Sequence, residues 1–458
     1  MRVGIIGGGI SGISLASKLC LMKKKGADLS VTLLEANSEL GGTMKTVCKE
    51  GFVIESGSNG FLDSKPFTLE TFKEAGLEGK LLRSNDNARI RFIQRYSKLH
   101  KIDTNPVKFL SSGLLTMKGK LRIACEMFVP QRKDGVDETL ASFAKRRLGE
   151  EALDFMIGPM VSGVFAGDPT KMSLKSSFPV IANLESQYGG LIKGFIKKRN
   201  KKSGPAGPGG VLTAYENGMG QALEDLAETA AKNGAEIIKS SPVEKVEKVD
   251  GVYKVTVKGG KVYEFDRLAV TCPAYKSAEF LKPLSAELSE TLASIPYSPM
   301  FVAGLGFHSE DVTDPIHGFG YLIPAKENRN ILGALFTSSM FPDQAPEGKK
   351  LLRIMCGGDT EKGHELLKKT DEELLEICID GVKDVLGVVG RPYVTQYFRH
   401  QMAIPQYHVG HSLKVAKIEE ILSKTEGLYL GGNIMYGISL NDCTRVSGEI
   451  AEKIKQSL

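Results

Sequence analysis

An apolar run near the start of the chain breaks into glycines and then continues in a helical pattern. Gly7, Gly9 and Gly12 have the G-x-G-x-x-G spacing of a dinucleotide-binding fingerprint. The first glycine permits a tight turn, the second lets the backbone approach a pyrophosphate, and the third allows close packing of helix on strand. The pattern predicts a strand at 2–6 and a helix over about 10–25, whose N-terminus offers free N–H groups to phosphates. A glycine-rich turn in an ordinary βαβ unit is the alternative interpretation.

A second apolar run, at 31–34, ends in Glu35. An acidic residue at the tip of the second strand is placed to accept hydrogen bonds from an adenosine ribose. Gly41 and Gly42 follow, and a glycine pair here lets a second stretch of backbone approach the same dinucleotide. This acid followed by a glycine pair is similar to flavoproteins of the amine-oxidase type, so it favours FAD over the cofactor of a soluble NAD dehydrogenase.

Length and composition restrict the class of protein. The 458 residues suggest two or three structural units, and 41% hydrophobic and 25% charged residues are typical of a soluble globular protein. We expect neither a transmembrane helix nor a signal peptide, because no apolar run is long enough and the chain begins with a strand. The net charge of +6 does not indicate nucleic acid but permits attraction to an anionic substrate or lipid. Seven scattered cysteines without C-x-x-C indicate a reducing cytoplasm.

The dinucleotide-binding region is predicted to be discontinuous, with parts at 1–85, 211–282 and 406–458. The middle part contains a helix that stops at Asn233-Gly234 and a hairpin that turns at Gly259-Gly260. The last part reads as strand, glycine turn and helix, so both ends of the chain are expected to fold onto one cofactor. Strands of the middle part are predicted around 243–246, 253–257, 261–265 and 267–274.

Two insertions separate these parts. We predict a helical, membrane-facing domain at 86–175 and a substrate domain at 176–210 and 283–405, in which alternating apolar stretches at 298–358 indicate a mixed or antiparallel sheet above the flavin. A basic run with a Gly/Pro loop at 192–210 is a solvated linker or a contact for anionic lipid headgroups. The predicted fold class is therefore α/β with an added α region: a Rossmann-like FAD-binding domain, a sheet-based substrate domain and a helical domain.

Seven segments resemble the oxygen-dependent protoporphyrinogen oxidases of haem biosynthesis. The resemblance implies tightly but non-covalently bound FAD and the six-electron oxidation of protoporphyrinogen IX to protoporphyrin IX, with O2 consumed and H2O2 released. It also implies peripheral association with an anionic membrane surface, and it leaves a homodimer open. The segments are GGGISG, SGSNGFLD, SGVFAGDP, GFGYLIP, LFTSSMFPDQAP, IPQYHVGH and GNIMYGISLNDC, which begin at residues 7, 56, 162, 318, 335, 404 and 432.

The resemblance assigns one cation and five small or apolar residues to the substrate cleft. Arg91 matches an arginine that pairs with a substrate propionate, because a guanidinium binds a carboxylate through two parallel hydrogen bonds. From the residues alone, a surface arginine on a strand is the simpler interpretation. Met355 stands where many members have Phe, and its thioether could still pack against a ring. The other four are Leu322 and Leu335, which sandwich a pyrrole ring, and Gly163 and Gly167, which match the cleft floor or, alternatively, end helices.

Further positions are assigned to the cofactor. The resemblance places Gly57, Ser58, Asn59, Val243, Gly432, Asn433 and Leu440 on FAD. Asn59 stands where some members have Arg, and the backbone of Val243 matches the position that holds the adenine. No catalytic side chain is assigned, because the flavin carries the redox chemistry. No metal is predicted: the seven histidines lack ligand spacing, and His408 with His411 is the closest pair.

Three alternatives remain at this stage. One is another flavoenzyme of the superfamily, such as an amine oxidase or a carotenoid desaturase, although the absence of Trp and of a clear Tyr pair counts against an amine oxidase. Another is oxidation of coproporphyrinogen III to coproporphyrin III, a substrate with two propionates in place of two vinyl groups. The third is a catalytically silent FAD-binding protein.

Overall fold

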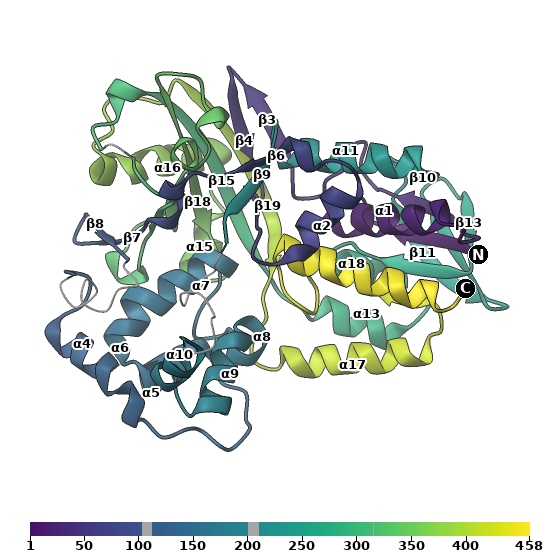
Figure 1. Cartoon of the computed structure of the whole chain (residues 1–458), viewed down its shortest axis with the longest axis horizontal. Coiled ribbons are helices and arrows are strands. Elements are labelled where there is room, and N and C mark those ends of the chain that lie inside the picture. Colours follow the sequence, from purple (N-terminus) through teal and green to yellow (C-terminus); the bar gives the residue numbers. More distant parts are fainter. Residues whose placement is uncertain (103–111, 200–209, 315) are drawn as a thin grey trace.

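The computed structural model describes the whole chain except residues 103–111, 200–209 and 315. Figure 1 shows three regions. One contains both termini, a second contains the longest strands, and a third is a group of helices at the lower left of the view. Within the described residues, no helix combines the length and the apolar character needed to cross a membrane. The mixture of a Rossmann-like region, a sheet region and a helical region confirms the predicted fold class.

The region with both termini is built on a five-stranded parallel sheet. Every neighbouring pair of strands in it is parallel, which is the arrangement of a dinucleotide-binding fold. Its strands come from the beginning, the middle and the end of the chain, so the region is discontinuous as predicted. In spatial order they are β10 (Ala235–Ile238), β2 (Ser30–Leu34), β1 (Arg2–Ile6), β14 (Arg267–Val270) and β20 (Leu428–Leu430).

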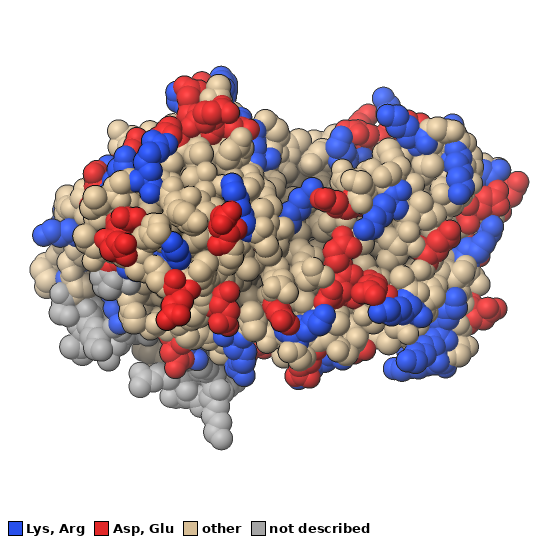
Figure 2. All heavy atoms as spheres, turned by 90° about the horizontal axis from the view of Figure 1, so that it is seen from above, with Lys and Arg blue, Asp and Glu red and all other residues tan. Residues whose placement is uncertain are grey.

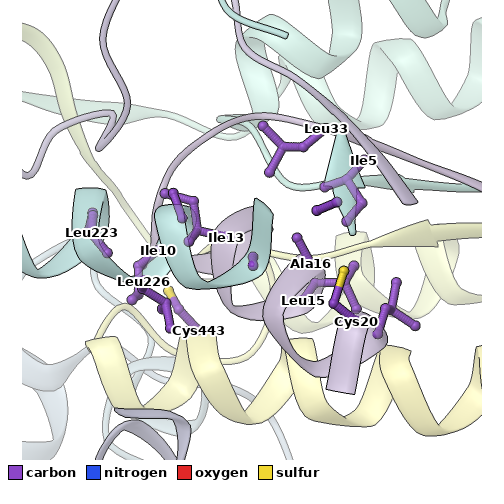
Figure 3. Packing of buried hydrophobic residues seen from close by; sticks show 14 of the residues in the cluster. Ile5, Ile10, Ile13, Leu15, Ala16, Cys20, Leu33, Leu223, Leu226 and Cys443 are labelled. Carbon is purple, nitrogen blue, oxygen red and sulfur yellow. The ribbon is translucent and has the colours of Figure 1, made fainter. Parts of the chain in front are cut away.

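Helices and a small sheet cover this parallel sheet. One face is packed by α1 (Ile10–Lys24), α11 (Met219–Lys232) and α18 (Leu440–Lys455), and α2 (Pro66–Glu74) packs on α18. Side chains from both strands and helices meet in this core, including Ile5, Leu33, Ile13, Leu226 and Cys443 (Figure 3). The other face carries an antiparallel sheet of β11 (Val243–Val249), β12 (Val252–Val257) and β13 (Val262–Phe265), and helices α12 (Ala274–Leu281), α13 (Ala286–Ala293) and α17 (His411–Lys424).

A seven-stranded sheet forms the second region. All its neighbours are antiparallel except β16 and β7, which run parallel. Helix α16 (Asp371–Leu386) packs on one face, where Phe301, Ile354 and Ile379 share a core. In spatial order the strands are β19 (Val394–Pro405), β15 (Tyr297–His308), β18 (Lys349–Gly357), β17 (Gly333–Phe336), β16 (Gly320–Leu322), β7 (Arg91–Arg95) and β8 (Lys98–Lys101), with α14 (Thr337–Met340) and α15 (Glu361–Leu366) in the connections.

Short sheets join the first two regions. One consists of β3 (Thr46–Lys49) and β4 (Phe52–Glu55), and the other of β5 (Phe61–Leu62), β9 (Leu212–Tyr215) and β6 (Leu81–Arg83). Phe52 and Ile54 of β4 lie against Gly306 and Gly304 of β15, where a Cβ would come within 2.7 Å and 2.3 Å of them. The face of the seven-stranded sheet opposite α16 therefore looks toward the dinucleotide-binding region.

The helical region has a core of its own. Phe143, Phe165, Leu184 and Leu191 come from four of its helices and are buried together. Arg147 is fully buried and donates to Glu126 at 2.6 Å and Glu185 at 2.8 Å. The helices are α4 (Met117–Ala124), α5 (Leu140–Arg147), α6 (Glu150–Ala152), a π-helical turn (Leu153–Ile157), α7 (Gly158–Phe165), α8 (Leu174–Ser177), α9 (Pro179–Tyr188) and α10 (Leu191–Arg199).

Two segments lie in other regions than the sequence indicates. Strands β7 and β8 fall within 86–175, assigned to the helical domain, yet β7 pairs with β16 in the large sheet. Helices α9 and α10 fall within 176–210, assigned to the substrate domain, yet their apolar residues belong to the core of the helical region. Both differences arise because pairing and packing with residues far away in the chain decide the placement, and the local pattern does not contain that information.

Candidate functional site

The glycine fingerprint forms an open cradle where β1 turns into α1. Gly7 has a φ of 110°, which only glycine adopts without strain, and a Cβ on Gly12 would lie 1.9 Å from the Gly7 carbonyl oxygen. A Cβ on Gly9 would meet no atom within 4 Å, so the space beside this backbone is open. The first turn of α1 has neither a side-chain cap nor an acidic residue. Unsatisfied N–H groups beside an open space fit a pyrophosphate.

The second glycine pair lies next to the first cradle. The Gly41 N–H donates to the Gly8 carbonyl at 2.8 Å, and a Cβ on Gly42 would lie 3.8 Å from the Cα of Gly9. Glu35 is buried, accepts from the Gly8 N–H at 2.6 Å, and accepts from Asn37 with its other oxygen at 2.8 Å. An ionised carboxylate has about four acceptor positions, so a ribose hydroxyl can still bind it.

The segment that holds Val243 also reaches Glu35. The Ser241 N–H donates to the Glu35 carbonyl at 2.8 Å, two residues before Val243 begins β11. Val243 pairs with Val257, and its side chain is half-buried. The backbone assigned to the adenine therefore lies near the acid assigned to the adjoining ribose.

Thr271, just after β14, joins the two ends of the chain. Its hydroxyl donates to the carbonyls of Ile6 and Gly7 at 3.0 and 3.1 Å. A Cβ on Gly432 would lie 3.2 Å from the carbonyl oxygen of Thr271. The closing turn and the first fingerprint therefore meet at one residue. The sequence contained no signal for this role of Thr271, because a threonine after a strand is common.

Tyr407 forms two hydrogen bonds with the closing turn. The Tyr407 hydroxyl donates to the Asn433 carbonyl at 2.6 Å and accepts from the Gly437 N–H at 3.1 Å. Leu440 begins α18, and its side chain belongs to the core around α1. The sequence contained no signal for this contact between Tyr407 and the closing turn.

The segment 57–59 lies between the dinucleotide-binding region and the large sheet. A Cβ on Gly57 would lie 2.5 Å from the Thr43 carbonyl, and the Ser58 hydroxyl donates to the Gly60 carbonyl at 2.7 Å. The Asn59 side-chain oxygen accepts from Arg353 of β18 at 2.9 Å. The loop assigned to FAD is thus bonded to the sheet assigned to the substrate.

The strand register brings most of the expected substrate residues onto one face. Gly320 pairs with both Leu335 and Arg91, and Gly333 pairs with both Leu322 and Met355. Residues paired across adjacent strands point to the same side of a sheet, so Arg91, Leu322, Leu335 and Met355 share the face opposite α16. All four side chains remain partly exposed.

The two glycines of the helical region differ in position. A Cβ on Gly163 would lie 2.7 Å from Leu322, so α7 approaches the face that carries Leu322. A Cβ on Gly167 would instead meet Gln406 at 2.8 Å and Met172 at 3.1 Å. Gly163 is therefore brought together with the other expected residues, whereas Gly167 packs against the segment that follows β19.

The surroundings of Arg91 are aromatic. Its guanidinium carbon lies 5.0 Å from the centre of the Phe319 ring, and burial lowers the pKa of Arg91 below its ordinary value. In the described part of the chain no carboxylate forms an ion pair with it. An arginine keeps its proton at neutral pH, so this side chain can bind an external carboxylate. On the face shown in Figure 2, by contrast, acidic and basic side chains are interspersed.

Histidines and acids do not form a metal centre among the described residues. His408 bonds Asp359 at 2.8 Å, and His411 stacks on Tyr407 with ring centres 4.0 Å apart. Burial lowers the pKa of His411 to about 4, so this ring is neutral at pH 7. The closest histidine pair thus has structural contacts.

Comparison with known proteins defines the class first. The family model for flavin containing amine oxidoreductases matches residues 10–448, and the chain belongs to this family. Within it, the chain is 31% identical to a coproporphyrinogen III oxidase of Bacillus subtilis, over 96% of this chain and 95% of that protein. It is 30% identical to a chloroplastic protoporphyrinogen oxidase of Nicotiana tabacum, over 98% and 84% of the two chains.

A solved structure agrees with these relatives. The chain is similar to a crystal structure from Exiguobacterium that is provisionally assigned as a protoporphyrinogen oxidase, with a TM-score of 0.84 and 25% identity over 100% of this chain and 99% of that one. The resemblance inferred from the motifs is confirmed, and FAD is the cofactor that the family and the glycine cradle indicate.

Proposed function

We propose that the chain oxidises protoporphyrinogen IX to protoporphyrin IX with bound FAD. The observation that supports this most is Arg91, a cation that pairs with no carboxylate of the described residues and lies on the same sheet face as Leu322, Leu335 and Met355. A porphyrinogen is a large apolar ring system with carboxylates at one edge, and this face offers an apolar surface with one cation. The names of the relatives describe oxidases of porphyrinogens, which supports the same substrate class for this chain.

The residues divide the work. Arg91 binds a propionate and so orients the ring, while Leu322, Leu335 and Met355 pack against the pyrroles and exclude water from them. Gly7, Gly9, Gly12, Gly41 and Gly42 let the backbone approach the pyrophosphate of FAD. Bound FAD accepts the electrons of the substrate in two-electron steps. We include O2 as the acceptor: the six electrons and six protons that leave the ring reduce three molecules of O2 to three of H2O2.

The substrate test compares two porphyrinogens. Purified FAD-loaded protein receives protoporphyrinogen IX or coproporphyrinogen III in air, and porphyrin fluorescence and H2O2 are followed together. We expect faster oxidation of protoporphyrinogen and one H2O2 for each pair of electrons. Faster oxidation of coproporphyrinogen would assign the chain to the activity named for the Bacillus subtilis relative. No turnover of either, with FAD bound, would contradict the proposal, and porphyrin without H2O2 would exclude O2 as the acceptor.

We also propose a cytoplasmic protein that attaches peripherally to an anionic membrane through residues 92–200. Several large apolar side chains of the helical region are exposed, and the lysines Lys118, Lys193 and Lys197 lie beside them. Apolar side chains with neighbouring lysines hold a helix on an anionic bilayer without crossing it. Parts of the expected basic and helical segments, 103–111 and 200–209, lie outside the described residues. The exposed apolar residues of this region include Met117, Leu121, Phe128, Val180, Phe195 and Ile196.

A further inference from the structure

Arg353 is a buried arginine for which the roles described above give no use. It lies on β18, pairs with Leu335 on the neighbouring strand and precedes Met355 by two residues, so it belongs to the proposed substrate face. Its side chain donates to the Asn59 oxygen at 2.9 Å, to the Ser56 carbonyl at 3.3 Å and to the Gly57 carbonyl. Residues of the large sheet and of the cofactor loop are joined by this one guanidinium.

All three acceptors of Arg353 are neutral. Among the described residues no carboxylate forms an ion pair with it, and Glu55 acts on it only at longer range. Burial lowers the pKa of Arg353 to about 10, which still leaves the cation at neutral pH. A buried charge that lacks a counter-ion is costly to the fold. Such a charge is stabilised when a bound ligand places a negative charge or a hydrogen-bond acceptor near it.

The charge of Arg353 affects the pKa of a neighbouring histidine. His400, on β19, has a pKa lowered mainly by burial, and the positive charge of Arg353 lowers it further. The guanidinium therefore sets a positive potential in this interior. In a medium of low dielectric constant such a potential extends over several ångströms.

Asn59 provides an independent observation. Arg353 occupies its side-chain oxygen, so the orientation of the amide is defined, and the amide nitrogen is buried without a hydrogen-bond partner among the residues that the structure describes. Buried amide donors are nearly always bonded. An unpartnered donor in a loop assigned to FAD fits a donor whose acceptor belongs to the cofactor.

We propose that Arg353 is a positioning residue that holds the Asn59 amide toward the flavin ring and raises the reduction potential of the bound flavin by its positive charge. Oxidised flavin is neutral, and uptake of two electrons with one proton leaves the reduced flavin with a negative charge, so a nearby fixed cation favours reduction. The inference rests on the proposed function only in requiring that FAD binds. It adds a residue of the large sheet to the groups that tune the cofactor.

The experiment compares FAD-loaded wild type with Arg353→Met, Arg353→Lys and the control Arg399→Met. Arg399 lies on β19 on the opposite face of the same sheet, bonded to Asp371, so its loss tests for a general effect of removing an arginine. The midpoint potential of the bound flavin is measured by equilibration with a reference dye, and FAD affinity and steady-state rates are measured alongside.

We expect Arg353→Met to shift the equilibrium toward oxidised flavin at least tenfold, which is about 30 mV for a two-electron couple. Arg353→Lys keeps the charge, so its potential should stay near that of the wild type while kcat falls, because a single ammonium cannot hold all three acceptors. Arg399→Met should change neither. A loaded Arg353→Met protein with the wild-type potential overturns the inference.

If Arg353→Met does not fold, Glu55→Gln decides the question at pH 8. The pKa of Glu55 is about 7, so at pH 8 its carboxylate partly offsets the arginine. Its replacement should raise the flavin potential, and an unchanged potential overturns the inference. A chain that takes up no FAD at all overturns the proposed function together with the inference, whereas FAD uptake with an unshifted potential overturns the inference alone.

Discussion

Arg91 is partly buried, lies beside an aromatic ring and has no acidic partner within the described part of the chain, and this combination suits a substrate anchor. A charge-assisted hydrogen bond contributes roughly 1.5–3 kcal/mol, so Arg91→Ala should lower kcat/KM for the porphyrinogen by about one to two orders of magnitude. Most of the loss should appear in KM, because the contact exists in the ground state and the transition state alike. Arg91→Lys should restore only part of the activity, since it lacks the two-pronged geometry.

Arg89→Ala is the matched control for Arg91, because Arg89 lies two residues away with a side chain that is 67% exposed. It should leave steady-state kinetics unchanged. Flavin absorbance measured on each variant should equal that of the wild type. A wild-type KM in Arg91→Ala, or loss of FAD from it, would show that Arg91 has another role.

Glu55 makes stability depend on pH. Burial raises its pKa to about 7, above the value of about 4.3 in an unfolded chain. Between these values the folded state binds more protons than the unfolded state, so this residue makes stability fall as pH rises from about 4.5 through 7. Glu55→Gln removes this dependence and should gain up to about 3 kcal/mol relative to wild type on going from pH 5 to pH 8.

Thermal unfolding at both pH values measures the effect of Glu55. Glu70→Gln is the control, because Glu70 is exposed on α2 and should follow the wild type at each pH. Parallel pH profiles for Glu55→Gln and wild type would contradict the prediction, since they would mean that Glu55 titrates alike in both states.

At the scale of elements, substitutions in the turn from β1 into α1 distinguish an effect on folding from an effect on cofactor binding. Gly9 has extended backbone (φ −85°, ψ −176°) and open space beside it, so Gly9→Val should fold yet block the approach of the pyrophosphate. Gly12→Val should lower stability by several kcal/mol, because its Cβ would collide with the Gly7 carbonyl.

Absorbance at the flavin band and thermal unfolding of the apoproteins measure both effects. Gly9→Val should be colourless with a Tm near that of wild-type apoprotein, whereas Gly12→Val should have a clearly lower Tm. Gly79→Ala, a glycine with free space and ordinary φ, is the control. Normal FAD content in Gly9→Val would contradict the assignment of the pyrophosphate to this turn.

The helical region should attach the protein to lipid. Wild type should float with anionic liposomes at low salt, and raised salt should weaken the attachment, because lysines contribute to it. Leu121 and Phe128 are 66% and 77% exposed, and Leu121→Glu with Phe128→Glu should reduce flotation at least tenfold, since each apolar side chain contributes about 1.5–3 kcal/mol when buried in the bilayer.

Leu413→Glu is the control for flotation. Leu413 is 74% exposed but lies on α17, in the region of the parallel sheet. This variant should float like the wild type. A wild type that stays in the aqueous fraction with anionic lipid would favour the interpretation of the basic run as a solvated linker.

At the scale of the whole molecule, FAD binding should stabilise the fold, because the cradle joins segments from both ends of the chain. A ligand at one hundred times its Kd adds about 2.7 kcal/mol, so reconstitution of apoprotein should raise the Tm of a chain of this length by roughly 3 °C. The purified protein should be yellow and should release FAD on acid precipitation. We expect no covalent bond between FAD and Cys443, because the Cys443 side chain is buried in the core beside α1. Flavin that stays with the pellet, or no change of Tm against a reconstitution without FAD, would contradict this.

Local features of this chain could be predicted from its sequence. The glycine fingerprint, the strand before it and the helix after it depend on backbone freedom within a few residues, so the predicted strand at 2–6 and helix from residue 10 match β1 and α1. The hairpin at Gly259-Gly260 is equally local, and both glycines have positive φ. The resemblance carried the family and the cofactor, because its segments are specific in order and spacing.

Tertiary structure alone decided which distant residues meet. Pairing of β7 with β16 placed Arg91 in the large sheet, and the meeting of β18 with residues 56–59 placed Arg353 beside Asn59. Thr271 and Tyr407 acquired their contacts in the same way. Strand register and inter-region packing are set by the summed burial of many side chains far apart in the chain, and no short stretch of sequence contains that sum.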